Sequence, residues 1–324
     1  MRTFLSVPLM VFLFVPTWSG ESRLALFGPR PTLTARQVAL DPADPARRRV
    51  GALDYLGGIE LRSNDGAFGG FSAMMVEGRR FTLLSDGGNL VAFTLAADWQ
   101  PRDARFWAVP DGPGTGWQKL ERDTESLTVD PKSGAVWVGF ERANAIWRYD
   151  RGFRVAGRNV APAVMANWPM NGGAEAMVRL RSGAFIVMGE TARFGAAGPR
   201  RAIRFAGDPT LNPRVGFGFG FVPPAGYDPV DIAELPDGDL IVLTRAISLA
   251  AGFTNMLVRL RTAAIRPGAV VRGTVIARLA PPLIHDNFEA LAITRERGQT
   301  IVWIASDDNQ NWFQRSLLLK FRLR

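Results

Sequence analysis

The sequence of 324 residues contains no cysteine and a single histidine, His285. The absence of thiols excludes disulfide bonds, iron–sulfur clusters, thiolate metal sites and cysteine nucleophiles. A single imidazole also excludes metal sites that need two or more histidines. Any metal ion would therefore depend on oxygen ligands, which calcium and magnesium prefer.

Lysine is scarce as well, so the formal net charge of +9 comes almost entirely from arginine; the three lysines are Lys119, Lys132 and Lys320. A basic chain can bind nucleic acid. The arginines are scattered, however, and no nucleic-acid-binding motif is present, so we expect no nucleic-acid partner. With 47% hydrophobic and 21% charged residues, the composition is that of a folded, water-soluble protein.

A long apolar run occurs only near the N-terminus. Arg2 precedes an apolar stretch at residues 4–15, and small residues follow up to Ser19. This three-part pattern predicts a secretory signal peptide at residues 1–19. An uncleaved membrane anchor is the alternative, although the stretch is shorter than the roughly 20 apolar residues that span a bilayer. We therefore expect a periplasmic or secreted mature chain, residues 20–324, with no transmembrane segment.

The rest of the chain repeats a unit of about 50 residues. Each unit has a first strand that starts near an acid or a hydroxyl, a hairpin turn such as residues 236–239, and a second strand rich in Val, Ile and Trp. Steps of 53, 50, 56 and 58 residues separate the members of this first column, which are Ser72, Glu125, Glu175, Asp231 and Glu289.

Units of this length, built from four short strands, are typical of propeller blades. The sequence therefore predicts an all-β fold, a β-propeller of five or six four-stranded blades within one domain. Five units are visible, and residues 49–63 are expected to supply the N-terminal strand that closes the ring. The spacing leaves both blade counts open.

A second column ends the second strand of each unit; its members are Asp86, Glu141, Glu190, Arg245 and Asp307, with Asp308 beside the last. Inner strands of a propeller line a central channel, so both columns are expected to converge there. Carboxylates crowded into one space repel one another unless a cation neutralises them.

The columns thus predict a calcium site with two sets of residues. We expect the first set to act on the substrate; it comprises Glu125, Glu175, Asp231, Glu289 and Arg245. We expect the second set to bind the metal; it comprises Asp86, Glu141, Glu190, Asp307 and Asp308. The alternative is that these acids accept hydrogen bonds from backbone amides at the ends of the blades and hold the ring together without a metal.

A serine hydrolase site is the other chemistry to consider. Residues 70–74 resemble a nucleophile elbow around Ser72, but Met74 stands where the second glycine belongs. A catalytic triad would have to use His285, which lies beside Asp286. An ordinary polar loop position for His285 is the favoured interpretation.

Several short stretches together resemble the phytase-like family, whose activity is described as esterase-like; they are residues 68–72 (FGGFS), 83–86 (LLSD), 171–176 (NGGAEA), 235–238 (LPDG), 286–290 (DNFEA) and 306–309 (SDDN). The resemblance covers about residues 50–324. It implies an exported bacterial β-propeller that hydrolyses phosphoric or carboxylic esters.

Two functional classes follow. The first is a metal-assisted hydrolase of a small-molecule ester, in which Arg245 or Arg142 stabilises negative charge; sugar-lactone hydrolysis is a variant of it. The second is a non-catalytic propeller of the cell envelope that binds a ligand or a partner protein on one face of the ring. The sequence does not indicate an oligomeric state.

Overall fold

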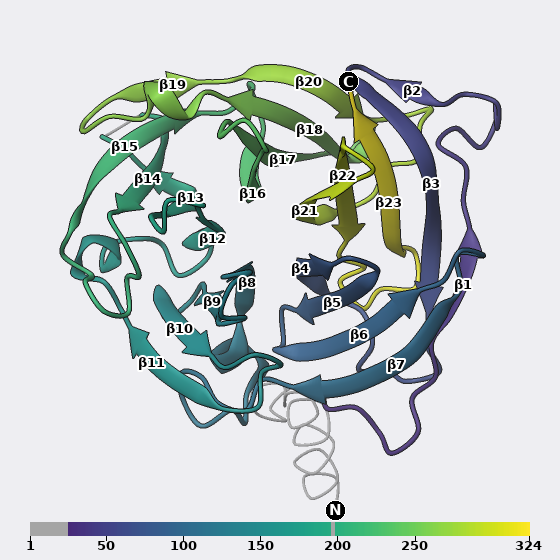
Figure 1. Cartoon of the computed structure of the whole chain (residues 1–324), viewed down its shortest axis with the longest axis horizontal. Coiled ribbons are helices and arrows are strands. Elements are labelled where there is room, and N and C mark those ends of the chain that lie inside the picture. The colour runs from purple at the N-terminus through teal and green to yellow at the C-terminus, as the bar shows by residue number, and fades with distance from the viewer. Residues whose placement is uncertain (1–24, 196–197) are drawn as a thin grey trace, which may run out of the picture.

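The computed structural model describes residues 25–195 and 198–324, and within them it is almost entirely β-structure. Five sheets stand around one central axis (Figure 1). Their innermost strands contact one another in a closed ring, which confirms the predicted propeller. Residues 1–19, the predicted signal peptide, lie outside the described residues.

The blades follow the repeat units in order, and each begins at its innermost strand. Blade 1 comprises β4 (Phe71–Glu77), β5 (Arg80–Ser85), β6 (Asn89–Leu95) and β7 (Pro101–Ala108). Blade 2 comprises β8 (Thr124–Val129), β9 (Val136–Phe140), β10 (Ala145–Tyr149) and β11 (Ala156–Val160). Blade 3 comprises β12 (Ala174–Arg179), β13 (Phe185–Arg193), β14 (Arg200–Phe205) and β15 (Gly216–Val222).

Blade 4 comprises β16 (Asp228–Glu234), β17 (Leu240–Ser248), β18 (Gly252–Leu260) and β20 (Thr274–Leu279). Its third and fourth strands are joined by a long connection that carries β19 (Val270–Arg272), and β19 pairs in parallel with β15 of blade 3. In the described part of the chain, three short 3-10 helices lie in connections; they are η1 (Lys119–Arg122), η2 (Ala163–Met165) and η3 (Thr262–Ala264).

Blade 5 combines the two ends of the described chain. Its C-terminal strands are β21 (Phe288–Glu296), β22 (Gln299–Ser306) and β23 (Ser316–Leu323). The fourth strand is β3 (Leu53–Arg62), which pairs with β23; β1 (Thr34–Gln37) and β2 (Arg49–Val50) pair with β3 in turn. The N-terminal segment therefore completes blade 5, as predicted, and the ring has five blades.

The same closure excludes a sixth blade, because residues 49–63 are used within the fifth. Dividing the length of the predicted mature chain by the average repeat length overestimates the blade count, because residues 34–62 supply outer strands of blade 5 and form no blade of their own.

Aromatic side chains join neighbouring blades. The Phe81 ring of blade 1 meets Trp303 of blade 5 edge-on, with centroids 4.7 Å apart. Trp137 of blade 2 and Phe185 of blade 3 pack in the same way at 5.0 Å. Large rings bury much apolar area where two twisted sheets meet, and they contribute strongly to the core between blades.

Two of the basic residues that recur on the third strands, Arg148 and Lys320, cover these rings. The Arg148 guanidinium lies 5.2 Å from the centroid of the Trp137 ring, and the Lys320 ammonium lies 4.9 Å from that of Trp303. Such cation–π contacts shield the aromatic edge of a blade from water. In the described part of the chain, no helix is long and apolar enough to span a membrane.

Ring closure can be tested at β3, which carries both a fully buried isoleucine and an exposed leucine. Ile59 is fully buried at the junction of β3 and β23, while Leu56 on the same strand is 40% exposed. We expect Ile59→Ala to lower the free energy of unfolding by about 2–5 kcal/mol, because it leaves a cavity in the closing blade.

The matched control Leu56→Ala should change this free energy by no more than about 0.5 kcal/mol. Both values come from urea unfolding followed by circular dichroism. Equal effects of the two substitutions would contradict the assignment of β3 as the closing strand.

Candidate metal centre

A local irregularity at the start of each inner strand positions the first column. The pairing of each inner strand with its neighbour shifts by one residue there, as in a β-bulge. A bulged residue is left out of the pairing, and its side chain is redirected. In four blades the residue passed over is the predicted column member, namely Ser72, Glu125, Glu175 or Glu289.

Blade 4 differs, because the shift there passes over Val230 and leaves Asp231 paired with Leu243. Asp231 accepts hydrogen bonds from the backbone N–H groups of Ile232, at 2.7 Å, and of Leu291 on β21, at 2.6 Å. Burial raises the pKa of Asp231. The structure thus places Asp231 between blades 4 and 5, where it joins their backbones, and not among the converging acids.

Both carboxylate oxygens of Asp308 also accept hydrogen bonds from the protein. Its Oδ1 accepts the N–H groups of Gly70 and Gln310, both at 2.9 Å, and its Oδ2 accepts the Ser316 hydroxyl at 2.6 Å. Gly69 has a φ of +110°, and a Cβ there would lie 2.2 Å from Asp308 Oδ1. For Asp231 and Asp308, the backbone-binding alternative describes the observed contacts.

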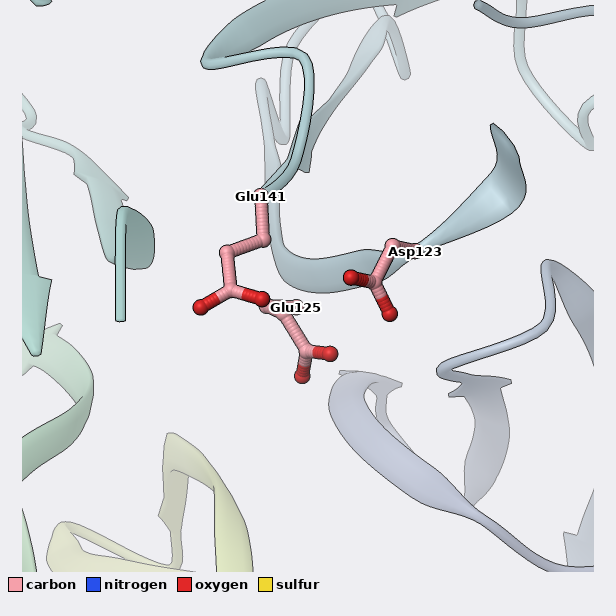
Figure 2. A group of neighbouring side chains, drawn as sticks. All are labelled: Asp123, Glu125 and Glu141. Carbon is pink, nitrogen blue, oxygen red and sulfur yellow. The ribbon is translucent and has the colours of Figure 1, made fainter. Parts of the chain in front are cut away.

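Two groups of three carboxylates meet near the axis and share Glu141. In the first, oxygens of Asp123, Glu125 and Glu141 lie within 4.8 Å of one another (Figure 2). In the second, the same holds for Glu141, Glu175 and Glu190. Glu141 follows β9, so blades 2 and 3 supply both groups. Spacings below 5 Å allow a single cation to contact three carboxylates.

The sequence prediction missed Asp123, which precedes β8 by one residue. It lies two positions before Glu125, and side chains two positions apart point to the same side of an extended chain. This spacing of two residues from Glu125 is the sequence feature that could have identified Asp123 as part of the site.

One buried oxygen of these groups, and one of the nearby Asp86, lack a hydrogen-bond partner among the described residues. Glu141 Oε1 accepts the backbone N–H groups of Gly172 and Gly173, which fixes its orientation. By contrast, Glu175 is 5% exposed, and its Oε2 has no hydrogen-bond partner among the described residues. Asp86 Oδ1 is in the same situation. A buried acceptor without a donor is costly, so each marks a position where a cation would be favourable.

Burial and like charge act together on the carboxyl groups. Burial, followed by the charge of Glu175, raises the pKa of Glu125 well above its usual value. Burial, followed by Glu190 and Glu141, does the same for Glu175. Burial and the neighbouring Glu141 raise the pKa of Asp123 to about 7. These carboxyls therefore hold protons more tightly than exposed acids do, as expected of a site that a positive charge would complete.

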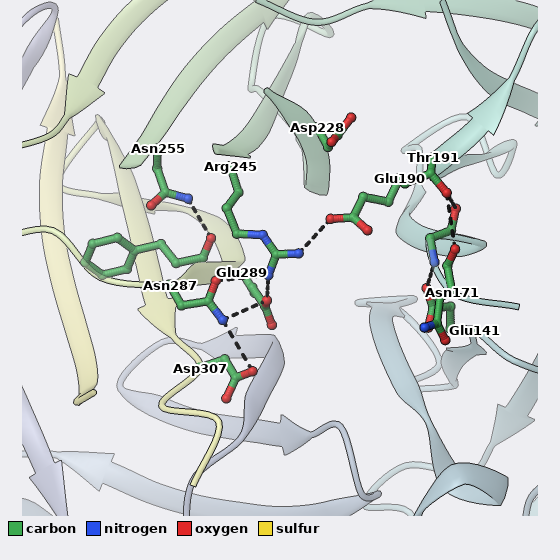
Figure 3. A network of polar contacts seen from close by, with 12 residues as sticks. Glu141, Asn171, Glu190, Thr191, Asp228, Arg245, Asn255, Asn287, Glu289 and Asp307 are labelled. Atoms are coloured by element: carbon green, nitrogen blue, oxygen red, sulfur yellow. Dashed lines mark hydrogen bonds and ion pairs between the residues drawn. The ribbon is translucent and has the colours of Figure 1, made fainter. Parts of the chain in front are cut away.

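Basic side chains form ion pairs with other acids of the same region. Arg245 pairs with Glu190 at 2.6 Å and with Glu289, and it donates to Asn287 at 2.9 Å (Figure 3). Lys119 of η1 pairs with Asp86 at 2.5 Å.

Asp307 accepts the backbone N–H of Asn309 at 2.5 Å and the side-chain amide of Asn287 at 3.4 Å. Burial and the charge of Asp86 raise its pKa to about 7. We call the eight acids of this region the acidic ring; they are Asp86, Asp123, Glu125, Glu141, Glu175, Glu190, Glu289 and Asp307.

The serine and histidine do not form a catalytic pair. The buried Ser72 hydroxyl donates to the carbonyl of Thr124 at 2.5 Å, which links blades 1 and 2. His285 Nδ1 bonds the carbonyl of Leu283 at 2.7 Å. No hydrogen bond joins Ser72 and His285 within residues 25–195 and 198–324.

The residues around Glu141 fit a divalent cation. Their ligand atoms are all carboxylate oxygens, which suit calcium. Binding would satisfy Glu175 Oε2 and reduce the repulsion between the two groups of acids. Of the predicted residues, the structure brings together Glu125, Glu141, Glu175 and Glu190, with Arg245 in contact with the last.

Comparisons with solved structures give only distant similarities. A hydrazine synthase from Kuenenia stuttgartiensis is 10% identical, with a TM-score of 0.37; the match covers 75% of this chain, which spans 58% of that one. A chain of a nidogen/laminin complex is 8% identical, with a TM-score of 0.43 and coverage of 89% and 93%. A 6-phosphogluconolactonase from Bacteroides fragilis, described as putative, is 10% identical, with a TM-score of 0.39 and coverage of 88% and 79%. No conclusion about function rests on these scores.

No curated protein sequence matches the chain. A family model does match, over residues 66–310, and its description is "Phytase-like: Esterase-like activity of phytase". The matched region runs from just before β4 to just beyond β22, so it contains both acid columns. The chain therefore belongs to the phytase-like family.

Proposed function

We propose that this propeller is a hydrolase of phosphoric or carboxylic esters that works with a calcium ion at the Glu141-centred acids. The observation that carries the proposal is the sharing of Glu141 between two groups of carboxylates, beside the unpartnered Glu175 Oε2. Glu125, Glu141 and Glu175 would hold the cation, with Asp123 and Glu190 on either side. Membership of the phytase-like family is consistent with hydrolase chemistry.

The bound cation would supply Lewis acidity towards an ester oxygen and lower the pKa of water. Asp123 is the candidate general base, because its carboxylate lies within 4.8 Å of the Glu125 and Glu141 oxygens that would hold the cation, close enough to take a proton from a water molecule beside it. Arg245 is the candidate group for stabilising negative charge on the substrate, since its guanidinium already lies among the acids. Hydrolysis adds the water oxygen to the ester carbon or phosphorus and releases the alcohol.

A non-catalytic envelope propeller is the second candidate function. The ion pairs of Arg245 and Lys119 favour it, because they neutralise part of the acidic ring without a metal. Under this alternative the ring face binds a ligand or a protein and does no chemistry.

Calcium binding is the first test of the metal site. We expect calcium at 100 times its dissociation constant to stabilise the fold by about 2.7 kcal/mol, seen as a higher melting temperature that EDTA reverses. The double variant Glu125→Gln/Glu175→Gln should lose this shift, because neutral amides bind calcium weakly.

Asp231→Asn is the matched control. It changes another inner-strand acid that lies outside both acid groups. Its melting temperature should be lower, but the calcium shift should remain. A wild-type melting temperature that is indifferent to calcium and to EDTA would contradict the metal site.

Hydrolysis is tested with 4-nitrophenyl phosphate, 4-nitrophenyl acyl esters and a sugar lactone, each with calcium or EDTA. We expect calcium-dependent turnover of at least one class. Asp123→Asn should lower kcat/KM by about 100-fold or more, since a general base contributes 10²–10⁴ in rate. Calcium binding without turnover of any class would favour the non-catalytic alternative.

Export to the periplasm or the medium is part of the proposal, and it rests on the pattern in residues 1–19. Protein purified from the cell envelope or the medium should begin near Gly20 by N-terminal sequencing. An intact Met1 on cytoplasmic protein would contradict it.

A further inference from the structure

The acids mark one face of the ring, which we call the acidic face. Inner strands start there and second strands end there, because the two run antiparallel. The β17–β18 turn, the β22–β23 loop and the β20–β21 connection therefore leave the blades at this face. Arg245, Asp307 and Asn287 stand where these three segments meet the acidic ring (Figure 3).

Large apolar side chains are exposed in the segments of the acidic face. The exposed fractions range from 44% to 110% for Trp117, Leu120, Met170, Ile247, Leu249, Trp312 and Phe313. Within the described residues, every exposed large aromatic side chain belongs to this set. Exposed apolar groups gathered on one face commonly mark a binding surface.

A pocket of about 690 Å³ lies between the β17–β18 turn and the β22–β23 loop. Its apolar walls are Ile247, Leu249, Phe253 and Phe313. A volume of this size fits a small organic ligand.

The charged residues of the pocket neutralise each other. Arg315 Nε donates to Asp286 at 3.3 Å, and its Nη2 donates to the backbone carbonyl of His285 at 3.3 Å. Asp286 also accepts the N–H of Asn287 at 3.0 Å. The pocket therefore offers an apolar wall with polar groups but no unpaired charge, and this suits an uncharged ligand.

The pocket adjoins the acidic ring. The Arg245 guanidinium, which pairs with Glu190 and Glu289, lies 6.0 Å from the centroid of the Phe253 ring. Asn287, the next residue after Asp286, donates to Glu289 and Asp307. A ligand seated against Phe253 would thus place its polar end within reach of Arg245.

Charge distinguishes between the two ester classes. Among the described residues that line the pocket, the only lysine or arginine is Arg315, and it is already paired with Asp286. A phosphomonoester dianion would therefore find no unpaired positive charge in the pocket, whereas a neutral carboxylic ester needs none. Charge and shape therefore favour the same class.

We propose that this pocket binds the apolar acyl or aryl group of a neutral carboxylic ester, and that such esters are the substrate class. The inference rests on the proposed hydrolase function for the reaction, but not for the binding. In the reaction, water adds its oxygen to the carbonyl carbon, the bond to the alcohol oxygen breaks, and a carboxylic acid and an alcohol leave.

Binding is tested with uncharged amides that are not hydrolysed, from butanamide to octanamide, by isothermal titration of the full-length mature protein in EDTA. We expect affinity to rise about 3- to 4-fold for each added methylene that reaches the apolar wall. Leu249→Ser/Phe313→Ser should abolish the rise; both side chains are exposed, so the variant should fold.

The matched control is Leu211→Ser/Val215→Ser. These two side chains are similarly exposed in the β14–β15 connection, at the opposite face. The control should keep the dependence on chain length. With calcium, kcat/KM for 4-nitrophenyl acyl esters should show the same dependence and exceed that for 4-nitrophenyl phosphate.

Failure of the pocket and failure of the hydrolase function give different results. Chain-length-dependent binding that the double variant abolishes, without ester turnover, would support the pocket and contradict the hydrolase. Ester turnover without any dependence of binding on chain length would overturn the pocket. Binding to phosphatidylcholine vesicles without amide binding would also overturn it, in favour of a membrane-docking face.

Discussion

Pairing between β3 and β23 is the contact on which the rest of the structure depends. Residues 53–62 and 316–323 lie at opposite ends of the chain, and their hydrogen bonds turn a row of five sheets into a ring. Only a ring brings the starts of β8, β12 and β21 to one axis, although these strands are up to about 160 residues apart in sequence. Asp54 reinforces the join, because it accepts ion pairs from Arg322 and Arg324 on the last strand and its end.

Closure has an electrostatic consequence, since it forces acids from several blades into a partly dry space. The chain neutralises them in three ways. Backbone amides bind Asp231 and Asp308, basic side chains bind Asp86, Glu190 and Glu289, and burial with neighbouring like charge raises the pKa of Glu125 and of Glu175. The second solution is incomplete at Asp86, whose Oδ1 has no donor although Lys119 pairs with its Oδ2. Glu175 Oε2 also has no donor, and no ion pair joins Glu175 to a basic side chain among the described residues; this combination distinguishes it from the other acids.

The repeat allowed the propeller and its closing strand to be predicted from sequence. Every unit has the same pattern of strands, and the lengths of the connections vary too little to hide it. The site was predictable only in part. A one-residue bulge determines which side chain points to the axis. In blade 4 the bulged residue is Val230 and not Asp231, and the spacing of the acids along the sequence does not reveal this difference. The ion pair of Lys119 with Asp86 could not be predicted either, because Lys119 lies in η1, in a connection that has no counterpart in the other repeat units.

The long connection of blade 4 has a consequence at the outer rim of the ring. In β15, glycine alternates with phenylalanine, and Gly220 donates its backbone N–H outward to the carbonyl of Ala269 just before β19. An unpaired outer strand rich in phenylalanine would offer its amides to a strand of another molecule. Because β19 pairs with residues 220–222, that part of the edge is already occupied. The segment that carries β19 forms no blade of its own, but it prevents this part of the outer edge of blade 3 from pairing with a strand of another molecule.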